Sequence, residues 1–129
     1  MKTIWNPNAA ANWSLIFTPA FGSYIHYKNW KELGDDNKAK TSLIWTIVAI
    51  IMTIVTVFVP AELGGNQVLF IFLVIWYFAN GRAQSKYIKQ NNIEYSKKGW
   101  GLPIVFGVLY LVLFIGIATA LEVAGIIQM

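Results

Sequence analysis

The side chains that could do chemistry in this chain are few, and they form no recognisable catalytic set. His26 is the only histidine, and Glu62 and Glu122 are the carboxylates nearest the hydrophobic segments. Histidine titrates near neutral pH, so His26 is a candidate for a proton relay or a pH sensor. Glu62 and Glu122 are candidates for an ion or proton site at the ends of hydrophobic segments. The alternative for all three is an ordinary place at a membrane surface, with His26 beside Tyr24.

Other kinds of reactive site lack the residues they need. The chain has no cysteine, which excludes thiol catalysis and cysteine-bound metal. Asp35 and Asp36 are adjacent, but no further acid follows them at the spacing of a calcium loop. Gly64 and Gly65 precede no Lys-Ser/Thr pair of a phosphate-binding loop. We therefore expect no catalytic residue, no metal site and no cofactor, and we predict that the protein is not an enzyme.

The composition indicates that these residues are positioned by membrane helices. Hydrophobic residues make up 57% of the 129 residues and charged residues 12%, about half the charge of an average soluble domain. Residues 42–59 and 101–121 are uncharged apolar runs long enough to cross the hydrocarbon core of a bilayer. Residues 63–79 form a third apolar run, which we expect to continue as a polar helix to residue 90.

The segment between Lys2 and Lys28 has the length of a span, but polar residues interrupt it. A full crossing by residues 8–28 is the first expectation, and an interfacial or re-entrant helix is the alternative. The sequence thus predicts an all-α integral membrane protein, a four-helix bundle built as two helical hairpins in one domain of residues 1–129. The helices are predicted at 8–28, 42–59, 64–90 and 101–125.

The basic residues cluster in two connections, residues 28–40 and 80–99, which together hold nine of the ten lysines and arginines. The short connection between them in the chain, residues 60–67, holds no basic residue. Because lysine and arginine are enriched in cytoplasmic loops, both basic connections are predicted to be cytoplasmic. This placement accounts for the net charge of +4 by topology and by attraction to anionic membrane lipids, so nucleic acid is not an expected partner.

Two predicted helices carry small or hydroxyl side chains at helical spacing, which is typical of surfaces where membrane helices meet. The face on the second helix has a period of 3.5 and should contact a neighbouring helix. The face on the fourth helix has steps of four, which permit close approach of two backbones, either within the chain or between subunits. The first face comprises Ser42, Thr46, Ala49, Thr53 and Thr56, and the second comprises Gly116, Ala120 and Ala124.

Two sequence stretches suggest a wider relationship. The opening WNPNAAANWSLIFTPAFGSYIHYKNWKELG and the later WYFANGRAQSKYI resemble small bacterial membrane proteins of unknown function. Their first segment is rich in aromatic residues, carries proline and glycine, and ends in a basic stretch containing tryptophan. The resemblance covers about half of the chain and implies a bacterial inner (cytoplasmic) membrane. It implies no activity and no functional residue.

The sequence features that could carry a function are therefore the helix faces and the predicted membrane topology. The leading hypothesis is a small non-enzymatic membrane protein that acts through helix–helix contacts with a membrane-protein partner. It would be a regulator, an assembly partner or an immunity protein against a membrane-active toxin. The alternative is a homo-oligomeric ion channel or small-solute transporter, with the hydroxyl face of the second helix lining the path and Glu122 at its mouth.

Overall fold

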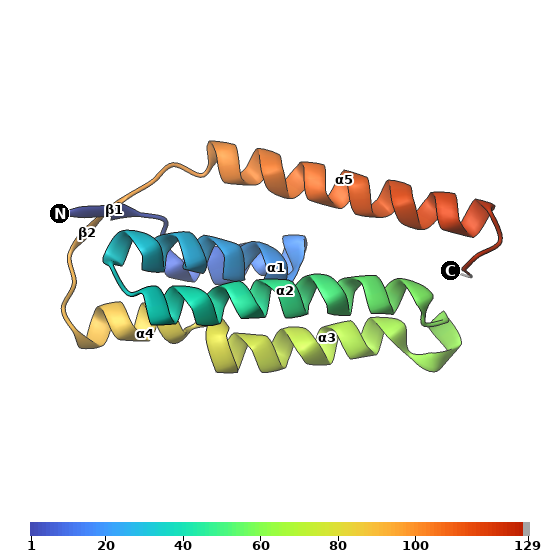
Figure 1. Ribbon diagram of the computed structural model, residues 1–129, viewed down its shortest axis with the longest axis horizontal. Coiled ribbons are helices and arrows are strands. Elements are labelled where there is room, and N and C mark those ends of the chain that lie inside the picture. The colour runs from blue at the N-terminus through green and yellow to red at the C-terminus, as the bar shows by residue number, and fades with distance from the viewer. Residues whose placement is uncertain (128–129) are drawn as a thin grey trace.

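The computed structural model describes residues 1–127, and most of them are helical (Figure 1). Long helices form the body of the molecule, and two short strands join the N-terminus to the last connection. The elements are β1 (Lys2–Ile4), α1 (Pro7–Leu33), α2 (Asp36–Phe58), the 3-10 turn η1 (Ala61–Leu63), α3 (Gly65–Trp76), the π-helical turn η2 (Tyr77–Gly81), α4 (Ala83–Gln90), β2 (Tyr95–Lys97) and α5 (Gly101–Val123).

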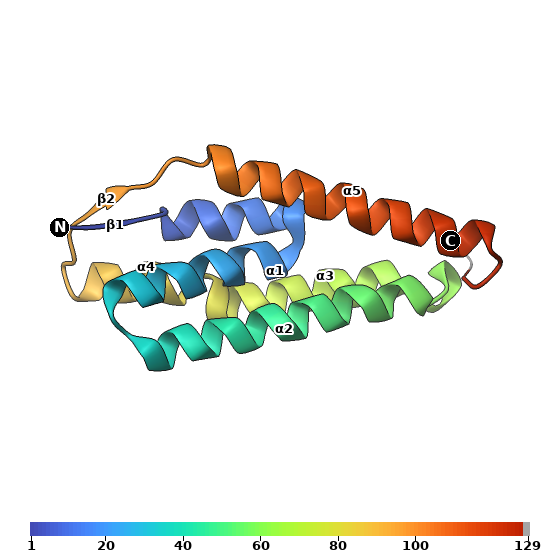
Figure 2. The same ribbon diagram turned by 45° about the horizontal axis from the view of Figure 1, so that its top comes forward.

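The first helix, α1, consists of two arms joined by a break at Thr18, which has φ 70° and ψ 162°. Pro19 follows, and proline disfavours the helical conformation in the residue before it. The second arm returns beside the first (Figure 2), so that Asn29 and Trp5 form two hydrogen bonds of 2.8 and 2.9 Å. Residues 7–33 therefore form a hairpin whose two ends lie at the same end of the molecule.

This hairpin contradicts the expectation that residues 8–28 cross a membrane once. A crossing would place Trp5 and Asn29 on opposite sides of the bilayer, whereas they are hydrogen-bonded to each other. Both ends of the hairpin lie together, which is the geometry that the re-entrant alternative requires. Three helices within residues 1–127 are long and apolar enough to span a membrane, and they cover Asp36–Phe58, Gly65–Gln90 and Gly101–Val123.

The turn between α1 and α2 is specified locally. Gly34 ends α1 in the left-handed conformation, with φ 82°, which glycine adopts without steric cost. The next residue, Asp35, caps α2 by accepting a hydrogen bond from the backbone N–H of Lys38 at 3.0 Å. A carboxylate at this position stabilises the start of a helix. The turn therefore directs α2 away from the end of the molecule where the hairpin begins and ends (Figure 1).

The core lies where α1, α2 and α3 meet. Ala20, Ala49 and Phe72 are buried there, one from each helix, and Trp45 and Met52 pack against them. Small residues at the crossing let the backbones approach closely, as is common between membrane helices. The hairpin is thus held on one side of the pair formed by α2 and α3.

At the other side of the hairpin, α5 packs chiefly against α1. A Cβ added at Gly107 would lie 2.8 Å from the ring of Phe17, so glycine lets α5 approach the tip of the hairpin. The strands β1 and β2 pair in parallel, with Lys2 opposite Tyr95. They lie at the same end of the molecule as α4 and the turn between α1 and α2 (Figure 1), so both basic connections meet at one end.

Candidate functional site

Five side chains join the second arm of α1 to the helix formed by α3, η2 and α4, and we call them the polar cluster. They are Ser23, His26, Asn29, Trp76 and Gln84, and each is at most 1% exposed. Trp76 Nε1 donates to Ser23 Oγ at 2.6 Å, and Gln84 Nε2 donates to the His26 carbonyl oxygen at 3.0 Å. Because an unsatisfied buried polar group costs about 1–3 kcal/mol, these contacts favour a single position of the hairpin.

Asn29 makes the largest number of contacts in the polar cluster. Its Oδ1 accepts from the backbone N–H of Trp5 at 2.9 Å, and its Nδ2 donates to the Trp5 carbonyl oxygen and to Gln84 Oε1, both at 2.8 Å. One side chain thus satisfies both backbone groups of Trp5, as a neighbouring strand would. Asn29 fixes the entry of the chain into the hairpin and ties that entry to α4.

His26 lies in the interior, stacked on Trp76 with 6.3 Å between ring centroids and 16° between planes. Its Nε2 is 3.1 Å from the carbonyl oxygen of Pro7, which can only accept, so Nε2 carries the proton. Burial lowers the pKa of His26 to about 4, against the hydrogen bond to Pro7, which acts to raise it. The His26 side chain is thus buried within the chain rather than exposed beside Tyr24, because the hairpin turns it inward.

Two glycines create the space that Trp76 occupies. A Cβ added at Gly22 would lie 2.1 Å from Ser14 Oγ and 2.9 Å from the Trp76 ring, and one added at Gly81 would lie 2.9 Å from the same ring. Contacts this short do not occur for real Cβ atoms, so a larger residue would displace the indole or separate the arms. The stack of Trp76 on His26 therefore depends on glycine at both positions.

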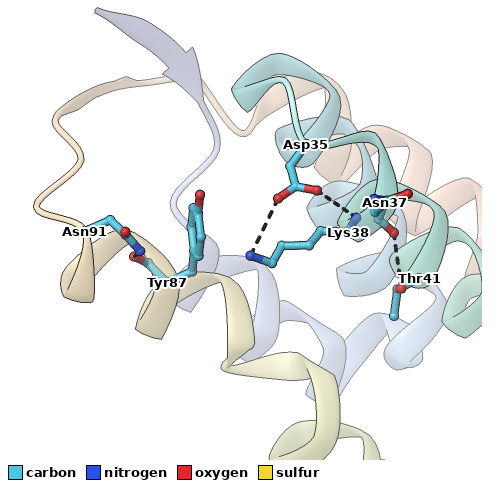
Figure 3. Close-up of polar contacts among 6 residues, drawn as sticks. All are labelled: Asp35, Asn37, Lys38, Thr41, Tyr87 and Asn91. Atoms are coloured by element: carbon cyan, nitrogen blue, oxygen red, sulfur yellow. Dashed lines mark hydrogen bonds and ion pairs between the residues drawn. The ribbon is translucent and has the colours of Figure 1, made fainter.

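A second set of contacts, at the surface, connects the start of α2 to α4 (Figure 3). Lys38 Nζ lies 3.7 Å from the centroid of the Tyr87 ring and 3.5 Å from Asp35 Oδ2. The ring of Trp30 meets Tyr87 edge-on, with 5.0 Å between centroids. A lysine placed between an aromatic face and a carboxylate is stabilised by both. These contacts hold the two basic connections together, because Lys38 meets an aromatic ring and a carboxylate rather than another cation.

The hydroxyl face of α2 is buried inside the chain. Ser42, Thr46, Ala49 and Thr53 are buried, and Thr56 is half-buried. Thr46 and Thr53 donate to the carbonyl oxygens four residues earlier, at 2.9 and 2.8 Å, and Thr56 donates to the Thr53 carbonyl oxygen at 2.7 Å. This face therefore packs within the chain, and three of its hydroxyl groups already bond to their own helix.

The small-residue face of α5 has the opposite environment. Gly116, Ala120 and Ala124 are exposed, and a Cβ added at Gly116 would meet no atom within 4 Å. At about 100° per residue, Gly116 and Ala120 lie across the helix from Gly107 and Ala118, which are buried, and Ala124 follows the last residue of α5. The small-residue face of α5 therefore points away from the rest of the chain.

The two candidate carboxylates are exposed and do not join the polar cluster. Glu62 lies in η1, and Glu122 lies in the last turn of α5. Both elements are at the end of the molecule opposite β1 and β2 (Figure 1), whereas His26 packs against the first residues of α1. The structure therefore does not bring His26 together with either glutamate.

The sequence predictions missed Ser23, Asn29, Trp76 and Gln84. A signal for part of this set was present, because Ser23, His26 and Asn29 recur at steps of three, which places them along one helix face. Their partner Gln84 is 58 residues from His26 in the chain, and no local pattern indicates that pairing.

The chemistry available to the polar cluster is that of a structural network. Every member except His26 Nδ1 has a hydrogen-bond partner, and none of the pockets described is lined by His26. Residues 1–127 contain no group of three or more metal-ligating side chains. Comparison with known proteins adds nothing to this chemistry, because no family model, curated protein or solved structure matches the chain.

Proposed function

We propose that the protein crosses a bacterial inner membrane three times and acts without catalysis, by binding a helix of another membrane protein. The basic connections would lie in the cytoplasm by the charge bias of membrane loops. The hairpin of α1 would enter the membrane from that side and return to it. The hydrogen bonds of the polar cluster support this insertion, because buried polar side chains away from water require partners within the protein.

One observation carries the partner-binding proposal: the small-residue face of α5 has no helix of its own chain beside it. The contacts of α5 with α1 lie near the tip of the hairpin, where Gly107 meets Phe17. Beyond that point, Gly116 and Ala120 are exposed on the side of α5 that faces away from the rest of the chain, and residues this small leave the backbone accessible. Membrane helices associate through such surfaces because close packing is the main force available in lipid.

The alternative of a channel or transporter has less support. Its expected lining was the hydroxyl face of α2, and the Thr53 side chain is 2% exposed and bonded to its own helix. A path along that face would require α2 to separate from α1 and α3. We therefore favour the binding of a partner helix over conduction through a self-assembled pore.

The test replaces exposed Val112, one turn before Gly116 on the same side of α5, with a photoreactive residue in the full chain. After irradiation of native membranes, we expect one crosslinked product with a different membrane protein, identified by mass spectrometry. Ala120→Ile should abolish this product, because the added side chain blocks close approach of the partner helix.

The matched control is Ile115→Phe. It also adds apolar bulk at an exposed position, but about 140° around the helix from Ala120, so it should leave the crosslink intact. Crosslinks to copies of this chain alone, or equal loss with both variants, would contradict the proposal.

A further inference from the structure

A second surface of the molecule, at its basic end, has the properties of a ligand site. A pocket of about 360 Å³ lies between the start of α1 and the outer face of α4, and we call it the basic pocket. Its charged and polar lining consists of Asn6, Asn8, Arg82, Ser85, Lys86 and Lys89, with aromatic side chains at its edge. This site is independent of the α5 surface, which lies on another helix.

The charge of the basic pocket is unbalanced. Arg82, Lys86 and Lys89 are four and three residues apart, so α4 presents them on one face. No acidic residue lines the pocket. The ion pairs within residues 1–127 involve Lys31 and Lys38, so none neutralises these three cations. Like charges at this spacing destabilise a helix, and an anion bound between them would reverse that effect.

The neutral part of the lining is already in place without a ligand. Asn6 caps α1 by accepting from the backbone N–H of Asn8 at 3.0 Å. Ser85 Oγ donates to Asn8 Oδ1 at 2.6 Å, which holds α4 against the start of α1. The polar cluster fixes the same two elements from the inside, through Asn29 and Gln84. The pocket therefore has a defined shape, so a ligand would not have to order it first.

The surroundings of the pocket distinguish a lipid from a soluble anion. The Arg82 guanidinium carbon lies 5.0 Å from the centroid of the Phe78 ring, and Phe78 is 62% exposed. Exposed Ile71 and Ile75 precede it on α3. A phosphate held by the basic pocket would thus lie beside an apolar helix surface along which acyl chains can pack. Basic pockets at the cytoplasmic ends of membrane helices bind acidic lipid headgroups in this way.

We propose that the basic pocket binds the phosphate of an anionic phospholipid headgroup. The three cations supply charge, and the Asn and Ser side chains supply further polar contacts. Lipid of this kind would stabilise the joint between the hairpin and α4, because it binds only when both are in place.

The experiment uses native mass spectrometry on the full-length protein in mild detergent, titrated with phosphatidylglycerol or with zwitterionic phosphatidylcholine. We expect one phosphatidylglycerol to bind at least tenfold more tightly than phosphatidylcholine. Lys86→Gln combined with Lys89→Gln should weaken phosphatidylglycerol binding about tenfold or more, since it removes two of the three positive charges that line the pocket. The matched control, Lys40→Gln with Lys97→Gln, removes the same charge outside the pocket and should change binding less than twofold.

Further arms separate the other outcomes. Lys86→Arg with Lys89→Arg keeps the charge and should retain binding, which distinguishes loss of a ligand from loss of the fold. Inorganic phosphate and glycerol 3-phosphate are added as competitors at millimolar concentration. Displacement of the lipid by either would identify a soluble anion as the ligand and overturn the lipid assignment. Equal weakening by the pocket variant and the control, or equal affinity for the two lipids, would also overturn it.

Discussion

At the scale of single residues, the polar cluster couples the protonation of one group to the fold of the hairpin. His26 lies in α1, outside the three candidate spanning helices, and its neutral ring is stacked on Trp76. A proton on Nδ1 would place a positive charge in a site where no described residue accepts a hydrogen bond from that atom. Burial of such a charge is unfavourable, so protonation should oppose the folded state.

We predict that stability falls as the pH is lowered through the range set by His26. The unfolded chain binds the proton near pH 6.5, and the folded chain only near pH 4. The stabilisation is therefore complete above pH 6.5 and is lost progressively down to about pH 4, by up to about 3 kcal/mol. Thermal unfolding in detergent between pH 7.5 and 4.5 measures it. His26→Gln should flatten this dependence relative to the wild type, and parallel pH profiles would contradict the prediction.

At the scale of elements, the break in α1 explains why a segment with the length of a span folds back on itself instead of forming one straight helix. Thr18 has a positive φ, which is strained for a β-branched residue, and its Oγ1 is buried without a hydrogen-bond partner. The strain is offset by contacts of both arms, above all those of Asn29 with Trp5. The contacts at the two ends of the hairpin thus stabilise it, while the backbone conformation at its tip is strained.

Replacement of Thr18 by glycine should therefore stabilise the protein. Glycine adopts this conformation freely, and the change also removes an unsatisfied hydroxyl, so we expect a gain of about 1 kcal/mol after the entropy of the unfolded chain is counted. Thr41→Gly is the control, because Thr41 lies in regular α2 and its replacement should cost a few tenths of a kcal/mol through the lower helix propensity of glycine. Thermal unfolding of both variants in the same detergent compares them. A loss of stability in Thr18→Gly would show that side-chain contacts at the tip outweigh its strain.

The elements differ in how well local sequence specifies them. α2 and α5 could be predicted because an uncharged apolar run of the right length is itself the signal. The polar residues and the proline of the first segment indicate that a re-entrant helix is an alternative to a crossing. The choice between crossing and returning depended on Asn29 reaching Trp5 and Gln84, which no local pattern encodes. The pairing of β1 with β2 joins residues 93 apart, such as Thr3 and Ser96, and was not predicted for the same reason.

At the scale of the whole molecule, the arrangement defines two ends with different compositions. Both ends of the hairpin, α4 and the two strands lie at one end, and the turn from α2 to α3 lies at the other (Figure 1). If the three candidate helices span a membrane, the start of the chain and both basic connections would lie on one side of it, whereas four spans would place the start on the opposite side from them.

Single-cysteine labelling tests this topology, and the absence of native cysteine makes the background clean. We expect Thr3→Cys and Glu94→Cys to react with an impermeant maleimide from the same side of sealed membranes, and Glu62→Cys from the opposite side. Spheroplasts and inverted vesicles provide the two orientations. Reaction of Thr3→Cys together with Glu62→Cys would indicate a first helix that crosses, and would contradict the hairpin.

The half-length hairpin also gives the molecule a taper. Its two arms stand beside α2, α3 and α5 only up to the tip at Thr18, so one half of the body contains five helical rods and the other half contains three. In a bilayer, such a body displaces more lipid from one leaflet than from the other. In a membrane the protein would therefore act as a wedge, and its energy there would depend on the curvature and lateral tension of the leaflet that holds the wide end.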